Sequence, residues 1–159
     1  MKLYILRHAK PAVGSLLISD IDRPLIQKGY DQCELVREQL LPLLKDHTQI
    51  YCSPSKRTWQ TAAHILSPEL LKKVIIDDSL YLANLTTLLR FIWKCGHTGD
   101  LLLIGHNNGI SELVNYFSDE KEEILSTCHL IGLEFDIQSW EEASRGMAKI
   151  FLNYRPQVS

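Results

Sequence analysis

The chain has 159 residues, of which 45% are hydrophobic and 23% are charged, and its formal net charge at pH 7 is −2. This size and composition fit one globular domain with a substantial core, so we expect residues 1–159 to form a single domain. The slightly negative charge excludes the global basic field of nucleic-acid-binding proteins, so any anion binding must be local.

Short β-type runs alternate with segments of helical periodicity along the chain. The runs that read as strands are residues 2–7, 48–52, 73–77, 100–105, 130–136 and 147–152. Apolar side chains recur at helical spacing between them. These are Cys33, Val36 and Leu40, then Leu85, Leu88, Leu89 and Ile92, then Ile110, Leu113, Val114 and Phe117.

Capping residues mark where two of the helices begin or end. Ser53 followed by Pro54 predicts a helix start with the serine as N-cap. Asn84 predicts the cap of a helix over residues 85–95, and Gly96 predicts its end.

Strands that alternate with helices of this length predict crossover units. The fold class is therefore α/β, a three-layer αβα sandwich with a mainly parallel central sheet. The last two strands lie too close together for a helical crossover, so we expect an antiparallel edge hairpin joined by the polar residues 138–146.

Other sequence features exclude several classes of protein. No apolar stretch approaches the roughly 20 residues that span a bilayer, and residues 3–6 are too short for the core of a signal peptide. We therefore expect a cytoplasmic protein without a membrane segment. The four cysteines lack a CxxC pair and favour reduced structural thiols, and no two cysteines or histidines have zinc-ligand spacing. We expect no metal and no cofactor.

Cationic and polar side chains follow three of the predicted parallel strands, and another lies in the loop before the first helix. Carboxyl ends of parallel strands share one edge of a sheet, where ligands bind. The segments are Arg7 and His8 after the first strand, CSPSKRTWQT with Arg57 after the second, LLLIGHNNGI with His106 after the fourth, and SDIDRPL with Arg23 before the first helix.

Each segment alone also fits a structural role, because an arginine can be a surface cation and Gly-His-Asn-Asn-Gly can be a tight turn. Their convergence on one edge favours a functional site instead. By contrast, the other histidines stand alone in helical or loop contexts, where surface or structural roles are expected. They are His47, His64, His97 and His129.

The chemistry that this set favours is phosphoryl transfer. Arginine pairs bidentately with phosphate oxygens, and helix N-termini add backbone donors. Together they can stabilise the charge on a transferring phosphoryl group without a metal. A neutral imidazole can attack phosphorus and form a covalent phosphohistidine, while a second histidine binds the equatorial oxygens.

These segments, in this order, resemble the histidine phosphatase superfamily, also called phosphoglycerate mutase-like proteins, over nearly the whole chain. LYILRHAK is similar to the family's Arg-His-Gly signature, with Ala9 in place of the glycine. The segments DRPLIQKG, SPSKRTWQTA and LIGHNNGISEL resemble its three other motifs.

The resemblance implies a phosphoglycerate mutase-like fold and a phosphatase in which His8 is the nucleophile. It implies that Arg7, Arg57 and His106 grip the phosphoryl group, and that Asn107 donates a further hydrogen bond. Arg23 matches an arginine of the compact SixA-type phosphohistidine phosphatases, and the short chain fits that branch.

Two departures from the family pattern bear on stability and on substrate. Ile26 stands where the family has a threonine, so the first helix loses an N-cap. The family's glutamate proton donor is absent from residues 77–86. An alkoxide leaving group needs such an acid, worth about 10²–10⁴-fold in rate, whereas phosphohistidine needs it less.

The acidic residues near the motifs offer substitute acids. Asp20, Asp22 and Asp77 are candidates, although we interpret each as a capping or solvated residue. Tyr81, which borders the same region, we interpret as a packing residue.

The preferred function is thus a metal-independent hydrolase of phosphate monoesters or phosphoramidates, with protein phosphohistidine as the favoured substrate. Its partners are a phosphorylated protein or a small phosphorylated metabolite, and neither nucleic acid nor a membrane. A broad small-molecule phosphomonoesterase and a non-catalytic phosphate-recognition module stay open. The sequence does not determine the oligomeric state.

Overall fold

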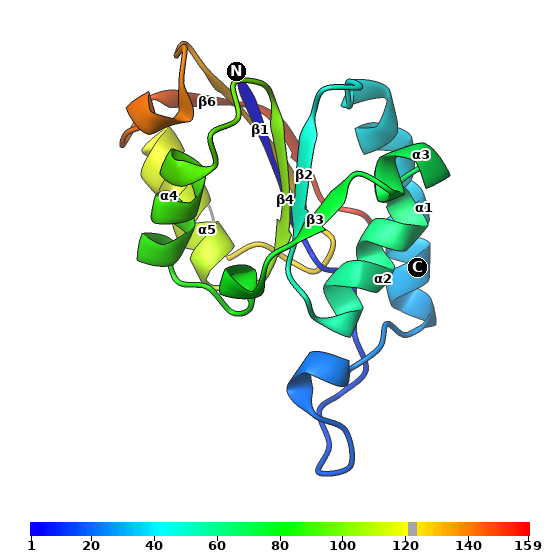
Figure 1. Cartoon of the computed structure of the whole chain (residues 1–159). Coiled ribbons are helices and arrows are strands. Elements are labelled where there is room, and N and C mark those ends of the chain that lie inside the picture. Colours follow the sequence, from blue (N-terminus) through cyan, green and yellow to red (C-terminus); the bar gives the residue numbers. More distant parts are fainter. Residues whose placement is uncertain (121–123) are drawn as a thin grey trace.

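The computed structural model describes residues 1–120 and 124–159, in which six strands form one sheet between two layers of helices (Figure 1). The strands are β1 (Lys2–Arg7), β2 (Gln49–Cys52), β3 (Val74–Ile76), β4 (Leu101–Gly105), β5 (Leu130–Phe135) and β6 (Ala148–Tyr154). The α-helices are α1 (Gln27–Leu40), α2 (Lys56–Ile65), α3 (Pro68–Leu71), α4 (Leu85–Lys94) and α5 (Gly109–Ser118). Short 3₁₀ helices are η1 (Asp20–Asp22), η2 (Leu41–Leu43), η3 (Asp78–Leu80) and η4 (Trp140–Glu142).

The strand order in the sheet is β3-β2-β4-β1-β5-β6. The strands β3, β2, β4 and β1 pair in parallel, while β5 pairs antiparallel with β1 and β6 pairs antiparallel with β5. This is the α/β sandwich that the alternating pattern predicts, and the antiparallel hairpin at the edge is confirmed. Every predicted strand is present, with ends that differ by at most two residues.

Two apolar clusters hold the helices on opposite faces of the sheet. On one face α1 and α2 pack on β1 and β2, through side chains such as Cys33 and Ile65. On the other face α4 and α5 pack on β1, β2 and β4, through side chains such as Ile92 and Phe117. Each fully buried side chain of this size stabilises the fold by about 1.5–3 kcal/mol.

The connections that leave neighbouring strands therefore run to different faces. The chain passes from β1 and from β2 to helices on one face, and from the intervening β4 to α5 on the other. Such a reversal opens a crevice beyond the carboxyl ends of the strands, which is where ligands bind in open α/β sheets.

The helix ends follow the predicted caps with one exception. Asn84 caps α4 by accepting a hydrogen bond from the backbone N–H of Thr87, and Gly96, with φ of 66°, follows the end of that helix. The prediction that Ser53 caps α2 is wrong, because the N-cap is Ser55. The side chain of Ser53 points instead to His106, where its hydroxyl is 2.7 Å from Nε2.

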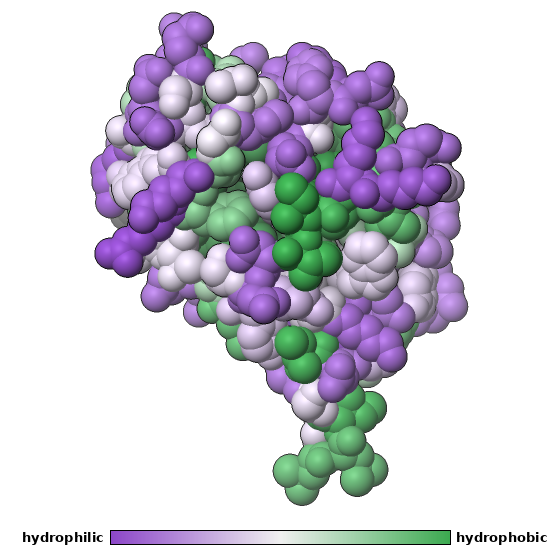
Figure 2. Space-filling model, viewed as in Figure 1, coloured by the Kyte–Doolittle hydropathy of each residue, from purple (hydrophilic) through white to green (hydrophobic). Residues whose placement is uncertain are grey.

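The segment between β1 and α1 projects from the body of the molecule, below the sheet in Figure 1. A β-bridge between Pro11 and Leu25 closes its base. Its tip is apolar and uncovered, since Leu16 and Leu17 are 107% and 95% exposed, and the tip stands out at the lower end of Figure 2. We call residues 11–25 the projecting loop; it also contains η1.

The remaining sequence expectations concern membranes and thiols. None of the described helices combines the length and apolarity needed to cross a bilayer. All four cysteines are free thiols, and three of them are buried.

Candidate active site

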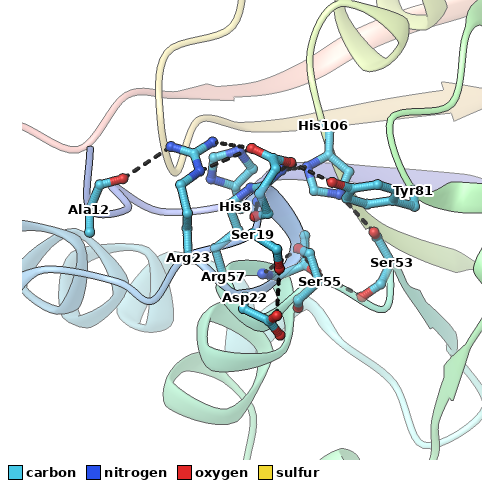
Figure 3. A network of polar contacts seen from close by, with 12 residues as sticks. His8, Ala12, Ser19, Asp22, Arg23, Ser53, Ser55, Arg57, Tyr81 and His106 are labelled. Atoms are coloured by element: carbon cyan, nitrogen blue, oxygen red, sulfur yellow. Dashed lines mark hydrogen bonds and ion pairs between the residues drawn. The ribbon is translucent and has the colours of Figure 1, made fainter. Parts of the chain in front are cut away.

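His8 and His106 lie side by side at the carboxyl ends of β1 and β4. The register that pairs Arg7 with Gly105 brings the two strand ends level, and the backbone N–H of His8 donates to the carbonyl of Gly105 at 3.2 Å. The centroids of the two imidazole rings are 5.3 Å apart, and both side chains are buried. Figure 3 shows the two rings close together, with Arg23 on one side and Tyr81 and Ser53 on the other.

The hydrogen bond of the His8 ring fixes which nitrogen carries the proton. Nδ1 is 2.8 Å from the carbonyl oxygen of Ala9, and a carbonyl only accepts, so Nδ1 donates. The lone pair of the neutral ring is then on Nε2. Burial lowers the pKa of His8 to about 4, and the positive charges of Arg57 and Arg7 add to this effect. His8 is therefore neutral at pH 7.

His106 is held by a hydroxyl and a guanidinium. Its Nε2 is 2.7 Å from the Ser53 hydroxyl, which can donate or accept, and its Nδ1 is 3.4 Å from Nη2 of Arg57. Burial lowers the pKa of His106 to about 3, with His8 and Arg57 contributing. Tyr81 packs against the His106 ring in a T-shaped arrangement, with the two centroids 5.5 Å apart.

Arg57 comes from the first turn of α2, whose cap orients it. The Ser55 side chain accepts from the backbone N–H of Thr58, which starts the helix so that Arg57 turns into the protein. Arg57 is only 1% exposed, and its Nε has no hydrogen-bond partner among the described residues. A buried guanidinium with an unused donor is suited to an anion.

Arg7 brings a second guanidinium to the histidines from the end of β1. Its Nη1 donates to the carbonyl of Leu125 at 2.7 Å, while its buried Nε has no partner in the part of the chain that the structure describes. Burial lowers the pKa of Arg7, and the charge of Arg57 lowers it further. The positive charges of Arg7 and Arg57 repel each other, so an anion that binds both guanidinium groups would stabilise them.

Asp20, from η1 in the projecting loop, reaches the same place. Its carboxylate accepts from Nη2 of Arg57 at 3.0 Å, from Nη2 of Arg23 at 2.8 Å and from the hydroxyl of Tyr81. The Tyr81 hydrogen bond and the charge of Arg57 hold the pKa of Asp20 well below its usual range. The interpretation of Asp20 as a capping or solvated residue is therefore incomplete, because its partly exposed carboxylate also binds the arginines of the site.

Tyr81 and Arg23 complete the ring of polar groups. The interpretation of Tyr81 as a packing residue is incomplete, because its hydroxyl joins Asp20. Arg23 also donates from Nη1 to the carbonyl of Ala12 at 3.0 Å, which ties the guanidinium to the base of the projecting loop (Figure 3).

The other candidate residues lie further out. The amide of Asn107 donates to the carbonyl of Leu125 at 2.7 Å and accepts from the Ser111 hydroxyl, so it braces the segment that also holds Arg7. A contact between Asn107 and a substrate stays a prediction. Asp77 caps η3, as interpreted, and the exposed Asp22 accepts from the Ser19 hydroxyl.

His64, His129 and a separate surface groove lie outside the cluster of histidines and arginines described above. His64 pairs with Glu34 on the surface, and His129 is buried with Nε2 bonded to Asn153. A separate groove runs between α4 and the β2–β3 edge, lined by residues that include Tyr51 and Arg90. No group of three or more His, Cys, Asp or Glu side chains is placed to hold a metal ion among the described residues.

Sequence reasoning missed the roles of Asp20, Ser53 and Tyr81. The carboxylate in SDIDRPL and the serine in CSPSKRTWQT lie within segments that the sequence had marked, but the direction of each side chain depends on tertiary contacts. The only local signal was their position beside Arg23 and Arg57.

Comparison with known proteins agrees with this geometry. The family model "Histidine phosphatase superfamily (branch 1)" matches residues 3–81, which include the first histidine, Arg57 and Tyr81. A search of functionally curated proteins gives no significant match.

Solved structures with the same fold cover almost the whole chain. A proposed phosphohistidine phosphatase SixA from Nakamurella multipartitia is 20% identical, with a TM-score of 0.80, over 99% of this chain and 96% of that one. The protein histidine phosphatase SixA complexed with tungstate is 19% identical, with a TM-score of 0.77, over 98% and 97%. A phosphoserine phosphatase variant from Entamoeba histolytica, in complex with phosphoserine, is 14% identical, with a TM-score of 0.66, over 98% of each chain.

Proposed function

The chain belongs to the histidine phosphatase superfamily and is a phosphatase, and from this premise we propose that it works through a covalent phosphohistidine on His8. In this proposal residues 1–159 are one histidine phosphatase domain, and the reaction needs no metal. The observation that carries the proposal is the lone pair on Nε2 of a neutral His8, beside a second imidazole and buried guanidinium groups.

In the first step Nε2 of His8 attacks phosphorus and forms a P–N bond. The bond from phosphorus to the leaving group breaks, and the leaving group departs with the electron pair. In the second step water attacks the phosphohistidine, the P–N bond breaks, and phosphate leaves with His8 neutral again. The Nδ1 donor bond to Ala9 holds the ring in the reactive tautomer and stabilises the positive charge that develops on it.

The arginines and His106 stabilise the negative charge on the phosphoryl oxygens. Arg7 and Arg57 have buried Nε donors that an oxyanion can accept, and Arg23 lies at the rim of the site. In the resting site Nη2 of Arg57 donates to Nδ1 of His106, so the proton is on Nε2, whereas phosphoryl binding requires an N–H on Nδ1. The Ser53 hydroxyl permits this change of tautomer, because it can donate to Nε2 once the proton is on Nδ1.

The favoured substrate is a protein phosphohistidine. Residues 77–86 hold no glutamate that could protonate an alkoxide, and the phosphoramidate of phosphohistidine has a better leaving group. The two SixA structures have this fold without a longer chain. A small-molecule phosphomonoesterase of broad specificity is the second candidate, favoured by the similar fold of the phosphoserine phosphatase.

The test of the covalent step replaces the nucleophile. His8→Ala should abolish turnover of an aryl phosphate and remove the acid-labile phosphoenzyme that rapid quenching traps in the parent protein. His64→Ala, which removes a surface histidine bound to Glu34, is the matched control and should keep both. Full activity of His8→Ala would contradict the proposal.

The test of substrate class compares a phosphohistidine protein, sugar phosphates and nucleotides by kcat/KM, each with and without EDTA. We expect the phosphohistidine protein to rank first and chelation to have no effect. Tight binding of tungstate without turnover of any of these compounds would favour a phosphate-recognition module instead.

A further inference from the structure

The arginines of the site bind an anion that belongs to the chain itself, the Asp20 carboxylate. We propose that the Asp20 carboxylate competes with the phosphate of the substrate for Arg57 and Arg23, which we call the arginine clamp. The carboxylate binds the clamp when no substrate is present and leaves it when a phosphoryl group binds. This inference rests on the proposed function, since it assumes that the clamp of Arg57 and Arg23 receives phosphate.

The contacts of Asp20 are those that a phosphate oxygen would make. Its carboxylate accepts from Nη2 of Arg57 at 3.0 Å and from Nε and Nη2 of Arg23 at 3.0 and 2.8 Å. Its backbone carbonyl accepts from Nη1 of Arg57 at 2.5 Å. One loop residue thus occupies both terminal nitrogens of the buried arginine. The Tyr81 hydroxyl donates to the same carboxylate oxygen as Arg57 and holds it in place.

The carboxylate leaves part of the site unsatisfied. The Nε atoms of Arg7 and Arg57 are buried without a partner among the described residues, and no contact joins Asp20 to Arg7. A carboxylate has two oxygens and one charge, whereas a phosphate monoester at neutral pH has three terminal oxygens and close to two charges. Phosphate therefore gains more from the site than Asp20 does.

Asp20 can leave without disturbing the core. Its side chain is 47% exposed, whereas that of Arg57 is 2% exposed, so the ion pair joins a fixed cation to a movable anion at the surface. The residue lies in η1, a single 3₁₀ turn of the projecting loop that has no buried residues. Movement of this turn releases Asp20 toward solvent and leaves α2 unchanged.

A competing carboxylate makes the affinity of the site depend on how strongly a ligand binds the arginines. A ligand binds only if it interacts with the arginines more strongly than a carboxylate does, so a monoanion such as a phosphodiester is disfavoured relative to a dianionic monoester. Asp20 would in this way be a specificity-determining residue for terminal phosphoryl groups.

A purely structural role for Asp20 predicts the opposite result. If its carboxylate served to position Arg57, its removal would disorder the guanidinium and weaken phosphate binding. If it competes, its removal strengthens binding. The sign of the change in affinity separates the two roles.

The experiment measures the affinity of inorganic phosphate and of tungstate by calorimetry for the parent protein, Asp20→Asn and Asp22→Asn. The Asp22 variant removes the same charge from the same turn, where the carboxylate contacts Ser19 and not the arginines. We expect Asp20→Asn to bind phosphate about tenfold more tightly than Asp22→Asn, the effect of losing one charge-assisted contact to a competitor. Equal or weaker binding by Asp20→Asn overturns the proposal.

A second measurement uses the parent protein and does not depend on the folding of a variant. In a crystal structure with tungstate bound between the histidines, the Asp20 carboxylate should have left Arg57. A structure in which tungstate and the Asp20 carboxylate both contact Arg57 also overturns the proposal. Both measurements record binding, so they stay independent of the phosphoenzyme assay with His8→Ala, and either idea can fail alone.

Discussion

At the scale of single residues, the state of His8 is set by one backbone carbonyl and by burial. The carbonyl of Ala9 holds the proton on Nδ1, and the low pKa keeps the other nitrogen free of a proton at neutral pH. An exposed histidine, with a pKa near 6.5, would be half protonated in weakly acidic solution and would lose its nucleophile there.

The first prediction is therefore an acid limb of the pH–rate profile that lies far below the usual value for histidine. For an aryl phosphate, kcat/KM corrected for ionisation of the substrate should stay level from pH 7 to about 5 and fall only as the pH approaches the His8 pKa of about 4. A limb that begins at about pH 6.5 would show that His8 titrates like an exposed imidazole.

Some residues of the site can be predicted from the sequence and others cannot. His8, His106 and Arg57 follow directly from their places after parallel strands, because strand direction fixes the edge at which they emerge. The Asp20 carboxylate and the Ser53 hydroxyl do not follow, since a loop conformation and a helix that starts two residues later decide where they point.

At the scale of elements, α1 begins without a side-chain cap. Ile26 occupies the N-cap position with an extended backbone, and its side chain makes no capping hydrogen bond. The sequence departure at this position predicted the missing cap. The backbone is already in the conformation that a capping serine needs, so the defect lies in the side chain alone.

The second prediction is that Ile26→Ser stabilises the protein. The serine hydroxyl can accept from a free N–H of the first turn, which raises the free energy of unfolding by about 1 kcal/mol. Urea denaturation measures it. The control is Ile18→Ser, which removes an isoleucine of similar exposure, 43% against 40%, outside any cap position. A gain of the same size in both variants would mean that apolar exposure, and not capping, is responsible.

The element scale also explains why the helix α2 was predicted with the wrong first residue. One serine precedes Pro54 and one follows it, so Ser53 and Ser55 are both possible caps. The sequence pattern favours Ser53, which stands before the proline. Tertiary contacts decide otherwise, because the Ser53 hydroxyl gains a buried partner in His106 that a cap would not provide.

At the scale of the whole molecule, the site makes folding sensitive to acid. The pKa values of His8 and His106 in the folded protein are about 4 and about 3, whereas an unfolded histidine has a pKa near 6.5. Between these values the unfolded chain binds protons that the folded protein does not. The stability that depends on these two neutral histidines is therefore fully present above about pH 6.5 and falls as the pH approaches 4.

The third prediction follows from this difference. The free energy of unfolding in urea should fall between pH 6.5 and 4 with up to about 1.4 kcal/mol per pH unit from each of the two histidines. His8→Asn should give a shallower slope than the parent, because one of the two buried histidines is removed. Equal slopes for the parent and His8→Asn would contradict the burial of an uncharged His8.

The order of the strands has a consequence for how the protein is made. His8 follows β1 and the Arg57 helix follows β2, yet these two strands do not pair with each other, because β4 lies between them and pairs with both. During synthesis on a ribosome, the first half of the chain lacks the strand that pairs with both. Only contacts away from the sheet pairing, such as the hydrogen bond from the Ala9 N–H to the Thr61 hydroxyl, can then join the two segments. Catalytic competence should therefore arise in one late event, once Gly105 has left the exit tunnel and β4 can insert between its neighbours.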